Sequence, residues 1–296
     1  MSNHVELSNV TKRFGEQRAV NQVDLVLKEG ESVGLAGHNG AGKSTVMKLI
    51  LGLITPEEGE VMLLGERTGS KAGAQQRSKI GYLPETVALH PSLTGLETMA
   101  FYAKLKKQSL AKNQELLERV GISQAAKRRV GTYSKGMRQR LALAQALLGE
   151  PKVLLFDEPT TGLDPASRQM FYEVVRELNQ KGATVLLSTH ALAELDGHAD
   201  RIVVMKNGAK VADGSMNELH VQSGLPLKIT VRLKQNQPLS AKWQCSDGLT
   251  FQAECRAEER MQLLGELGNL AQLDYIDIHT PTLDEMYAQF LKREDV

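Results

Sequence analysis

The chain has 296 residues, enough for about two domains with sizeable cores. Its 36 Lys and Arg balance 35 Asp and Glu, so the charge gives no reason to expect nucleic acid as a partner. Hydrophobic residues at 41% and charged residues at 24% are ordinary globular levels, which excludes global disorder. The polar opening does not resemble a secretory leader, and no apolar run reaches 18 residues. We therefore expect a cytoplasmic protein that acts at a membrane only through a partner.

The first part of the chain alternates apolar and polar residues as strands do. Strands are predicted at 4–10 and 20–27, and a short apolar strand at Ser32–Ala36 runs into the segment GHNGAGKST. This segment fits a phosphate-binding loop, in which small residues let backbone N–H groups turn toward phosphate oxygens at a helix N-terminus. The candidate nucleotide-binding residues are Gly37, His38, Asn39, Gly40, Ala41, Gly42, Lys43, Ser44 and Thr45.

Two residues of this loop have expected roles toward a nucleotide. Lys43 is expected to pair with the β and γ phosphates, and Ser44 to hold Mg²⁺. The alternative is a plain glycine-rich turn. Its position between a strand and a helix favours the nucleotide interpretation, with Mg²⁺ as the accompanying ion.

The middle of the chain changes to helical spacing. From about residue 86 to 149 apolar residues recur three and four apart, which predicts a helical insertion that includes the segment YSKGM at 133–137. Beyond it, KVLLF and ATVLLST are apolar runs separated by a helical pattern, as in buried parallel strands with a crossover helix. The predicted fold class is therefore α/β. RIVVMKNGAKVADG adds a hairpin around Asn207 and Gly208.

The predicted strand KVLLF ends in two adjacent carboxylates. Asp157 is expected to reach Mg²⁺ through water, and Glu158 to orient and deprotonate an attacking water. Acidic residues at a strand end are also common as simple surface turns. A phosphate loop in the same chain favours a metal and a base.

The C-terminal part has strand and helix patterns without nucleotide chemistry. We place a boundary between residues 219 and 220, so that 1–219 forms one domain and 220–296 a small α+β domain. Its last helix is predicted to begin at Thr282, with Glu285 completing a capping box. The apolar face of that helix either docks against a second copy or closes the small domain's own core. Its residues are Leu283, Met286, Tyr287, Phe290 and Leu291.

The order of these motifs, from about Val5 to Leu219, resembles the nucleotide-binding subunit of an ATP-binding cassette (ABC) transporter. The resemblance implies a P-loop ABC-type domain with a helical subdomain, and an ATPase that works as a homodimer. It also implies that Ser134 and Gly136 bind the γ phosphate of ATP held by the opposite subunit. His190, which follows ATVLLST, resembles the family's switch histidine and would contact the γ phosphate. Asp164 resembles the residue that links the two sites, and Phe14 the aromatic that stacks on adenine, with a core phenylalanine as the alternative for Phe14.

Two segments depart from the family's usual pattern. GYLPE places Glu85 where the family usually has a glutamine that touches Mg²⁺ and the membrane partner, so Glu85 is a candidate metal ligand that adds negative charge near a triphosphate. The signature YSKGM replaces the commoner LSGGQ, so that Lys135 brings a cation near the γ phosphate and Met137 cannot hydrogen-bond. Both changes put the strength of a closed dimer in question.

The resemblance implies a membrane permease as partner and a place on the inner face of the cytoplasmic membrane. The segments GHNGAGKST, GYLPE, YSKGMRQRLALAQALLGEP, SGLPLKI and YIDIHTPTLDEMY also resemble the ATPase subunits of NosDFY transporters, which serve copper-site maturation of nitrous oxide reductase. A NosY-like permease and, through it, a NosD-like periplasmic subunit would then be the partners. The alternatives are a general exporter of drugs, lipids or polysaccharides, a non-transport cassette protein, and an unrelated P-loop kinase or GTPase.

The two cysteines do not show the spacing of a copper site. Neither CxxC nor CxxxH occurs around Cys245 or Cys255, and Cys255 alternates with apolar residues in a strand pattern. We therefore predict that Cys255 is a buried structural thiol.

Overall fold

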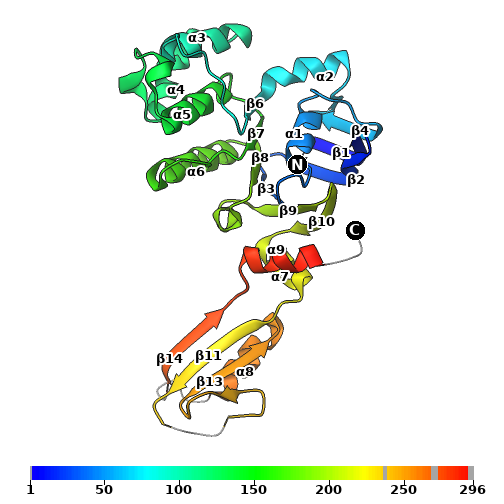
Figure 1. The fold of residues 1–296 in the computed structure, drawn as a ribbon, viewed down its shortest axis with the longest axis vertical. Helices are drawn as coiled ribbons and strands as arrows, with labels where there is room; N and C mark the ends of the chain where they lie inside the picture. Colours follow the sequence, from blue (N-terminus) through cyan, green and yellow to red (C-terminus); the bar gives the residue numbers. More distant parts are fainter. Residues whose placement is uncertain (1, 236–238, 268–272, 293–296) are drawn as a thin grey trace. The chain divides into compact units, whose positions relative to one another are not determined.

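The computed structural model describes residues 2–235, 239–267 and 273–292 (Figure 1). The chain divides into two compact units, the first ending at Asp213 and the second beginning at Gly214. The boundary that the sequence indicated, between residues 219 and 220, falls inside helix α7 (Met216–Ser223). This helix belongs to the second unit because it packs against α9 (Leu283–Lys292).

The first unit begins with an antiparallel sheet in the order β2-β1-β4-β5. The alternating pattern of its long strands turns Val5, Leu7, Leu25 and Leu27 toward the core. The strands β1 and β2 are longer than predicted, and β4 and β5 add two that the sequence pattern did not indicate. Their bounds are β1 Asn3–Phe14, β2 Gln17–Lys28, β4 Glu58–Leu63 and β5 Glu66–Arg67.

A second sheet of six strands, in the order β10-β9-β3-β8-β7-β6, forms the centre of the first unit. The strands β9, β3, β8, β7 and β6 pair in parallel, and β10 is joined to β9 by the predicted turn at Asn207 and Gly208. The strands β3, β7 and β8 are wholly buried, as their continuous apolar runs predicted. Their bounds are β3 Ser32–Ala36, β6 Ile80–Leu83, β7 Val153–Asp157, β8 Thr184–Thr189, β9 Arg201–Lys206 and β10 Ala209–Gly214.

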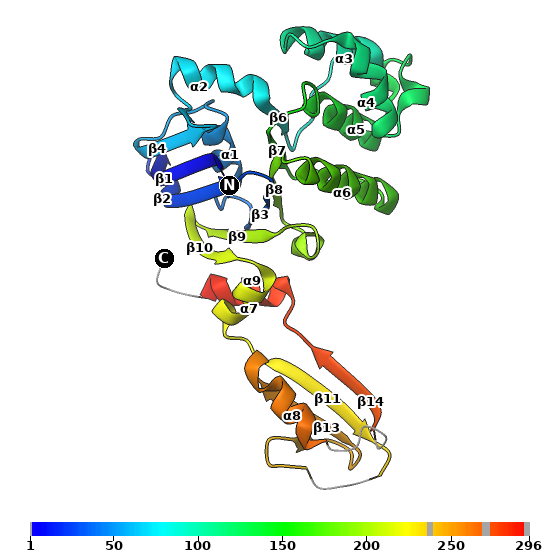
Figure 2. The same ribbon diagram turned by 180° about the vertical axis from the view of Figure 1, so that it is seen from behind.

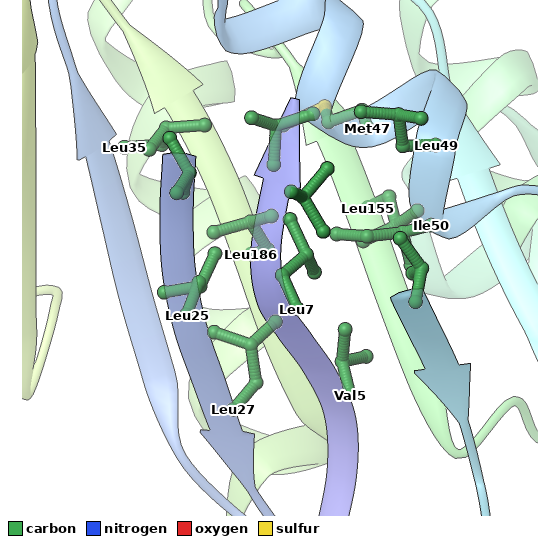
Figure 3. Close-up of a cluster of buried hydrophobic side chains, with 14 of the residues drawn as sticks. Val5, Leu7, Leu25, Leu27, Leu35, Met47, Leu49, Ile50, Leu155 and Leu186 are labelled. Atoms are coloured by element: carbon green, nitrogen blue, oxygen red, sulfur yellow. The ribbon is translucent and has the colours of Figure 1, made fainter. Parts of the chain in front are cut away.

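Helix α1 (Lys43–Ile50) lies between the two sheets and joins their cores. Figure 3 shows Met47, Leu49 and Ile50 pointing toward Leu7 of one sheet and Leu155 of the other. These side chains are essentially inaccessible to solvent. Burying a large apolar side chain stabilises a fold by about 1.5–3 kcal/mol, so this cluster holds the start of α1, and the loop before it, against the central sheet.

Residues 86–149 contain a lobe of three helices, which both views show gathered together apart from the antiparallel sheet (Figures 1 and 2). Helix α5 packs against β6, so the lobe is attached along the edge strand of the central sheet. Helices α2 and α6 complete the first unit, α6 being the crossover between β7 and β8. The helices are α2 Lys71–Gln76, α3 Gly95–Leu105, α4 Asn113–Arg119, α5 Lys135–Ala146 and α6 Pro165–Gln180.

The second unit has an antiparallel sheet in the order β12-β13-β11-β14, with its own apolar core. Cys255 is 4% exposed in that core, which confirms it as a buried structural thiol. Thr282 and Glu285 form the predicted capping box at the start of α9. The remaining elements are β11 Leu227–Leu233, β12 Gln244–Cys245, β13 Thr250–Cys255, α8 Arg260–Glu266 and β14 Leu273–His279.

The apolar face of α9 is covered inside the chain. Leu283, Met286 and Phe290 are all buried, and α9 packs against α7. Of the two alternatives left open by the sequence, the structure therefore supports closure of the chain's own core. Among the described residues, no helix is both long and apolar enough to cross a bilayer.

Candidate active site

The carboxyl ends of four parallel strands meet at one edge of the central sheet. The pairing sets Ala36 beside Thr189 and Asp157 beside Ser188, and β6 lies next to β7 with the same direction. The segments that follow these ends carry the phosphate loop, His190, Glu158 and Glu85. The edge beyond the carboxyl ends of the strands is where open α/β sheets bind ligands. Motifs far apart in the sequence are thereby brought together.

The glycine-rich loop needs glycine for steric reasons. Gly42 has φ of 105°, and a Cβ there would lie 2.3 Å from the carbonyl oxygen of Ala19. A Cβ on Gly37 would lie 2.9 Å from the carbonyl oxygen of Met205. The close packing of backbone on both sides leaves no room for larger residues. It also fixes the N-terminus of α1, which begins at Lys43 and has Ser44 and Thr45 in its first turn.

Lys43 is buried in the loop with its ammonium group at the centre. Nζ donates to the carbonyl oxygens of Gly37 at 2.6 Å and His38 at 3.3 Å, and lies 3.9 Å from Glu158 Oε1. Burial lowers the pKa of Lys43. The negative charges of Glu158, Asp157 and Glu85 oppose this shift and act to raise the pKa. A buried cation among carbonyl groups and carboxylates is suited to bind an anion such as phosphate.

Asp157 and Glu158 are both buried at the end of β7. The Ser188 hydroxyl donates to Asp157 Oδ1 at 2.6 Å and accepts the backbone N–H of Glu158 at 3.1 Å. Glu158 has φ of 50°, in the left-handed region that non-glycine residues rarely adopt. The role of Ser188 was not predicted. Its signal was a polar residue inside the apolar run ATVLLST.

Glu158 and His190 form a direct pair. His190 Nδ1 lies 2.7 Å from Glu158 Oε2, and the backbone N–H of His190 donates to the same oxygen at 3.3 Å. Because an ionised carboxylate can only accept, Nδ1 carries the ring proton in this pair. The His190 side chain is 61% exposed, whereas that of Glu158 is 8% exposed. The other oxygen of Glu158, Oε1, is buried and has no hydrogen-bond partner among the described residues.

Glu85 follows β6 and is exposed. Together with Asp157 it acts on the neighbouring phenol: burial, Asp157 and Glu85 raise the pKa of Tyr82 to about 12. The negative charge of Glu85 also acts to raise the pKa of Lys43, so Glu85 lies within electrostatic reach of the loop. The structure thus brings Glu85 toward the predicted metal ligands Ser44 and Asp157.

The donors present suit Mg²⁺ shared with a nucleotide. No group of three or more His, Cys, Asp and Glu side chains that could hold a metal ion occurs in the described part of the chain. Ser44 and Asp157 supply hydroxyl and carboxylate oxygens, which Mg²⁺ prefers, and it commonly takes its other ligands from substrate phosphates and water. These residues fit an ion that arrives with ATP.

The other predicted residues lie at the starts of two helices, where Ser134 and Asp164 are exposed and Gly136 is half-buried. Ser134 begins α5 and accepts the N–H of Met137 at 3.2 Å. Gly136 faces Leu163, since a Cβ at this glycine would lie 3.8 Å from Leu163 Cδ2. Asp164 begins α6 and accepts both the N–H and the hydroxyl of Ser167, which lowers its pKa. The start of the helix with the signature therefore lies beside the loop that contains Asp164.

Phe14 ends β1 and is 52% exposed, which overturns the core alternative for this residue. The ammonium of Lys12 lies 5.5 Å from its ring centroid. An exposed ring of this kind is accessible to a stacking base, and the adenine contact remains a prediction.

Comparison with known proteins supports the same class. The model of the ABC transporter family matches residues 20–161. The linearmycin resistance ATP-binding protein LnrL of Bacillus subtilis is 36% identical, over 73% of this chain and 70% of that protein. The Nod factor export ATP-binding protein I of Sinorhizobium fredii is 33% identical, over 98% of this chain and 86% of that protein.

Solved structures agree in fold. The ATP-binding subunit of an ABC transporter superposes with a TM-score of 0.68 at 33% identity, covering 74% of this chain and 93% of that one. An ATP-binding cassette solved as a dimer in a post-hydrolysis state with ADP and Pi gives a TM-score of 0.67 at 30% identity, covering 72% of this chain and 98% of that one.

The fold and the site define a P-loop ATPase: a phosphate loop, a buried carboxylate pair and a histidine meet at the carboxyl edge of a parallel sheet. The chain belongs to the ABC transporter family and is an ATP-binding subunit. ATP and Mg²⁺ are its ligands, and ATP hydrolysis is its activity.

Proposed function

We propose that the chain energises a membrane transporter by hydrolysing ATP with Glu158 as the general base. The observation that carries this proposal is the geometry of Glu158, buried, paired with His190 at 2.7 Å and lying 3.9 Å from the ammonium of Lys43. A general base must be within hydrogen-bond reach of the proton that it takes. Glu158 Oε1 is a buried acceptor with no hydrogen-bond partner among the described residues, and an attacking water would supply its missing donor.

The surrounding residues then have distinct tasks. Lys43 would exchange its loop carbonyl groups for the β and γ phosphates, and Ser44, Asp157 and Glu85 would hold Mg²⁺. Mg²⁺ when bound neutralises charge on the phosphates. His190 keeps Glu158 oriented through Nδ1, and its exposed ring is open to the γ phosphate. Phe14 offers its ring to adenine.

Two copies of the chain complete the site. Ser134 and Gly136 stand at the start of the 12-residue helix α5, where backbone N–H groups and the helix dipole favour an anion. Ser134 is exposed, and Gly136 leaves its N-terminal turn open. In the homodimer this turn binds the γ phosphate of the partner's ATP, and Asp164 links the two sites. A related cassette was solved as a dimer, which supports this arrangement.

The membrane partner is a permease, and our finer proposal is a NosY-like permease with a NosD-like subunit beyond it. Its support is the resemblance of the quoted segments, which include SGLPLKI and YIDIHTPTLDEMY outside the ATPase motifs. The alternative is an exporter. It is favoured by relatives named for Nod factor export and linearmycin resistance, one of which is similar along 98% of this chain.

The catalytic proposal is tested with Glu158→Gln. The amide preserves size and most hydrogen bonds but cannot take a proton, so ATP hydrolysis should fall about 10²–10⁴-fold while ATP affinity is kept. Phosphate release measures ATP hydrolysis, and equilibrium titration measures ATP affinity. Hydrolysis within threefold of the wild type would refute Glu158 as the base.

The partner proposal is tested by co-expression and affinity purification. The tagged chain is expressed once with the NosY-like permease and once with the permease of an exporter from the same source. Retention of the NosY-like permease alone, with ATPase activity changed on binding, is the expected result. Retention of the exporter permease alone would support the alternative instead.

A further inference from the structure

Glu194 is a partly buried carboxylate that the proposed chemistry does not use. It lies in a short 3₁₀ helix, Leu192–Leu195, that directly follows the His190 segment, and its side chain is 18% exposed. Its two oxygens accept hydrogen bonds from three side chains on other segments. A carboxylate with this many donors is held in one position.

The three donors are a threonine, a tyrosine and an arginine. The Thr160 hydroxyl donates to Oε2 at 2.6 Å, and the Tyr172 hydroxyl to the same oxygen at 3.1 Å. The Arg168 guanidinium donates to Oε1 at 2.9 Å. Thr160 is 4% exposed and Tyr172 is 6% exposed, so both hydroxyls depend on an acceptor inside the protein.

Through these hydrogen bonds Glu194 is connected to both ends of the segment between Glu158 and Asp164. Thr160 stands two positions after Glu158. At the other end, Arg168 Nε donates to the carbonyl oxygen of Leu163 at 3.1 Å, directly before Asp164. Glu194 therefore joins the segment that begins with His190 to the one that runs from Glu158 to Asp164.

Tyr172 fixes this arrangement to α6. Its ring stacks on His198, with 3.9 Å between the centroids. Burial and the charge of Glu194 raise the pKa of Tyr172, so its hydroxyl stays protonated and keeps donating. By contrast, the Arg168 side chain is 44% exposed, and an ion pair at such a position contributes only about 0–1 kcal/mol. The two buried hydroxyls thus dominate the energetics of this cluster.

We propose that Glu194 is a positioning residue for hydrolysis. It holds the His190 segment and the Glu158–Asp164 segment in a fixed position relative to each other. The inference rests on the proposed roles of Glu158 and His190. Within the described ranges, the side-chain hydrogen bonds of Glu194 go to Thr160, Arg168 and Tyr172 and to neither the Glu158 nor the His190 side chain. Its loss should therefore misplace the base and the histidine relative to bound ATP without weakening the phosphate loop.

The test compares Glu194→Gln, Thr160→Val and the double variant, with Glu173→Gln as control. Glu173 is an exposed glutamate on α6 whose carboxylate accepts a hydrogen bond from Gln169 of the same helix. We expect kcat for ATP to fall about tenfold in each single variant, with KM within twofold, because misplacement acts on the transition state. The double variant should be no slower than the slower single variant, since both remove one interaction. Thr160→Ser, which keeps the hydroxyl, should restore kcat, and the control should stay within twofold.

Three results would overturn the inference. They are a kcat within twofold of the wild type in Glu194→Gln, an effect on KM alone, and a double variant whose fall in kcat equals the product of the two single falls. A thermal melt accompanies each variant, and a lowered Tm with unchanged kcat would make Glu194 merely structural. Failure of the proposed function is separate, because it would appear as hydrolysis that is insensitive to Glu158→Gln in the otherwise unchanged chain.

Discussion

Glu158 has an unfavourable backbone conformation at the centre of the proposed chemistry. A non-glycine residue in the left-handed region costs about 1–2 kcal/mol, and Glu158 has φ of 50°. The hydrogen bond of its N–H to Ser188 and the pairing of its side chain with His190 stabilise this conformation. Such outliers are found at functional sites, where surrounding structure holds them. The strain aims the carboxylate at Lys43 and the phosphate loop.

Lys43→Ala should weaken ATP binding about 10–100-fold. Hydrogen bonds to charged groups contribute about 1.5–3 kcal/mol, and Lys43 is the buried cation of the loop. Calorimetric titration with MgATP measures the change, and a thermal melt checks that the variant is folded. An unchanged Kd in a folded variant would refute the assignment of this loop.

At the residue scale, the parts of the site that follow from local spacing could be predicted. The loop at 37–45 and the pair Asp157 and Glu158 are continuous in sequence, so their chemistry is visible without the fold. The contacts of Ser188 and Glu194 link segments more than 20 positions apart. No local pattern reports such contacts, because they depend on which strand ends become neighbours.

At the element scale, strands with continuous or alternating apolar patterns were predicted well, and weakly patterned ones were missed. The predicted runs at β3, β7, β8 and β13 all form strands. In β4 only Val61 and Leu63 are buried, and acidic residues occupy much of the remainder, so its pattern was too short to recognise. A strand of six residues with only two buried side chains leaves a weak signal in the sequence.

The attachment of the helical lobe depends on close backbone packing and one buried cation. A Cβ on Gly81 would lie 2.3 Å from the carbonyl oxygen of Ala146, so only glycine lets α5 approach β6 this closely. Lys106, at the end of α3, donates from Nζ to the carbonyl oxygens of Ile80 at 3.0 Å and Leu148 at 3.1 Å. One ammonium group therefore joins the end of α3, the start of β6 and the end of α5.

Lys106 gives this attachment a pH dependence. Burial lowers its pKa from 10.5 to about 8, so between these values the unfolded chain binds a proton that the folded chain lacks. Stability from this site therefore rises with pH across that window. The free energy of unfolding of the wild type minus that of Lys106→Met should rise by up to about 1.4 kcal/mol per pH unit above pH 8.

Urea unfolding at several pH values from 7 to 9.5 measures this difference. Lys104→Met is the matched control, because Lys104 is an exposed lysine on the same helix. Equal pH dependence of the two variants would contradict a lowered pKa for Lys106.

At the scale of the whole molecule, the two units have separate cores. The core of the first unit joins both sheets through α1, and that of the second lies between its sheet and α8. The proposed nucleotide chemistry lies wholly in the first unit. Leu283, Met286 and Phe290 on the apolar face of α9 are buried, so these side chains are not free to dock on a second copy.

A chain that ends at Ser215 should keep ATP binding within about threefold of the full chain, since all loop contacts and the core around α1 are retained. Titration with MgATP compares the two chains. Loss of ATP binding by a truncated chain that still melts cooperatively would show that the second unit contributes to the site.

The central claim is that two copies of this chain enclose ATP between the phosphate loop of one and the Ser134 turn of the other. The most direct measurement is light scattering with size-exclusion chromatography on Glu158→Gln alone, with and without MgATP. Blocked hydrolysis should hold the closed state, so MgATP should double the mass from the 32.5 kDa monomer, and Ser134→Ala in the same background should weaken the dimer. A chain that binds MgATP and stays at the monomer mass would contradict the account.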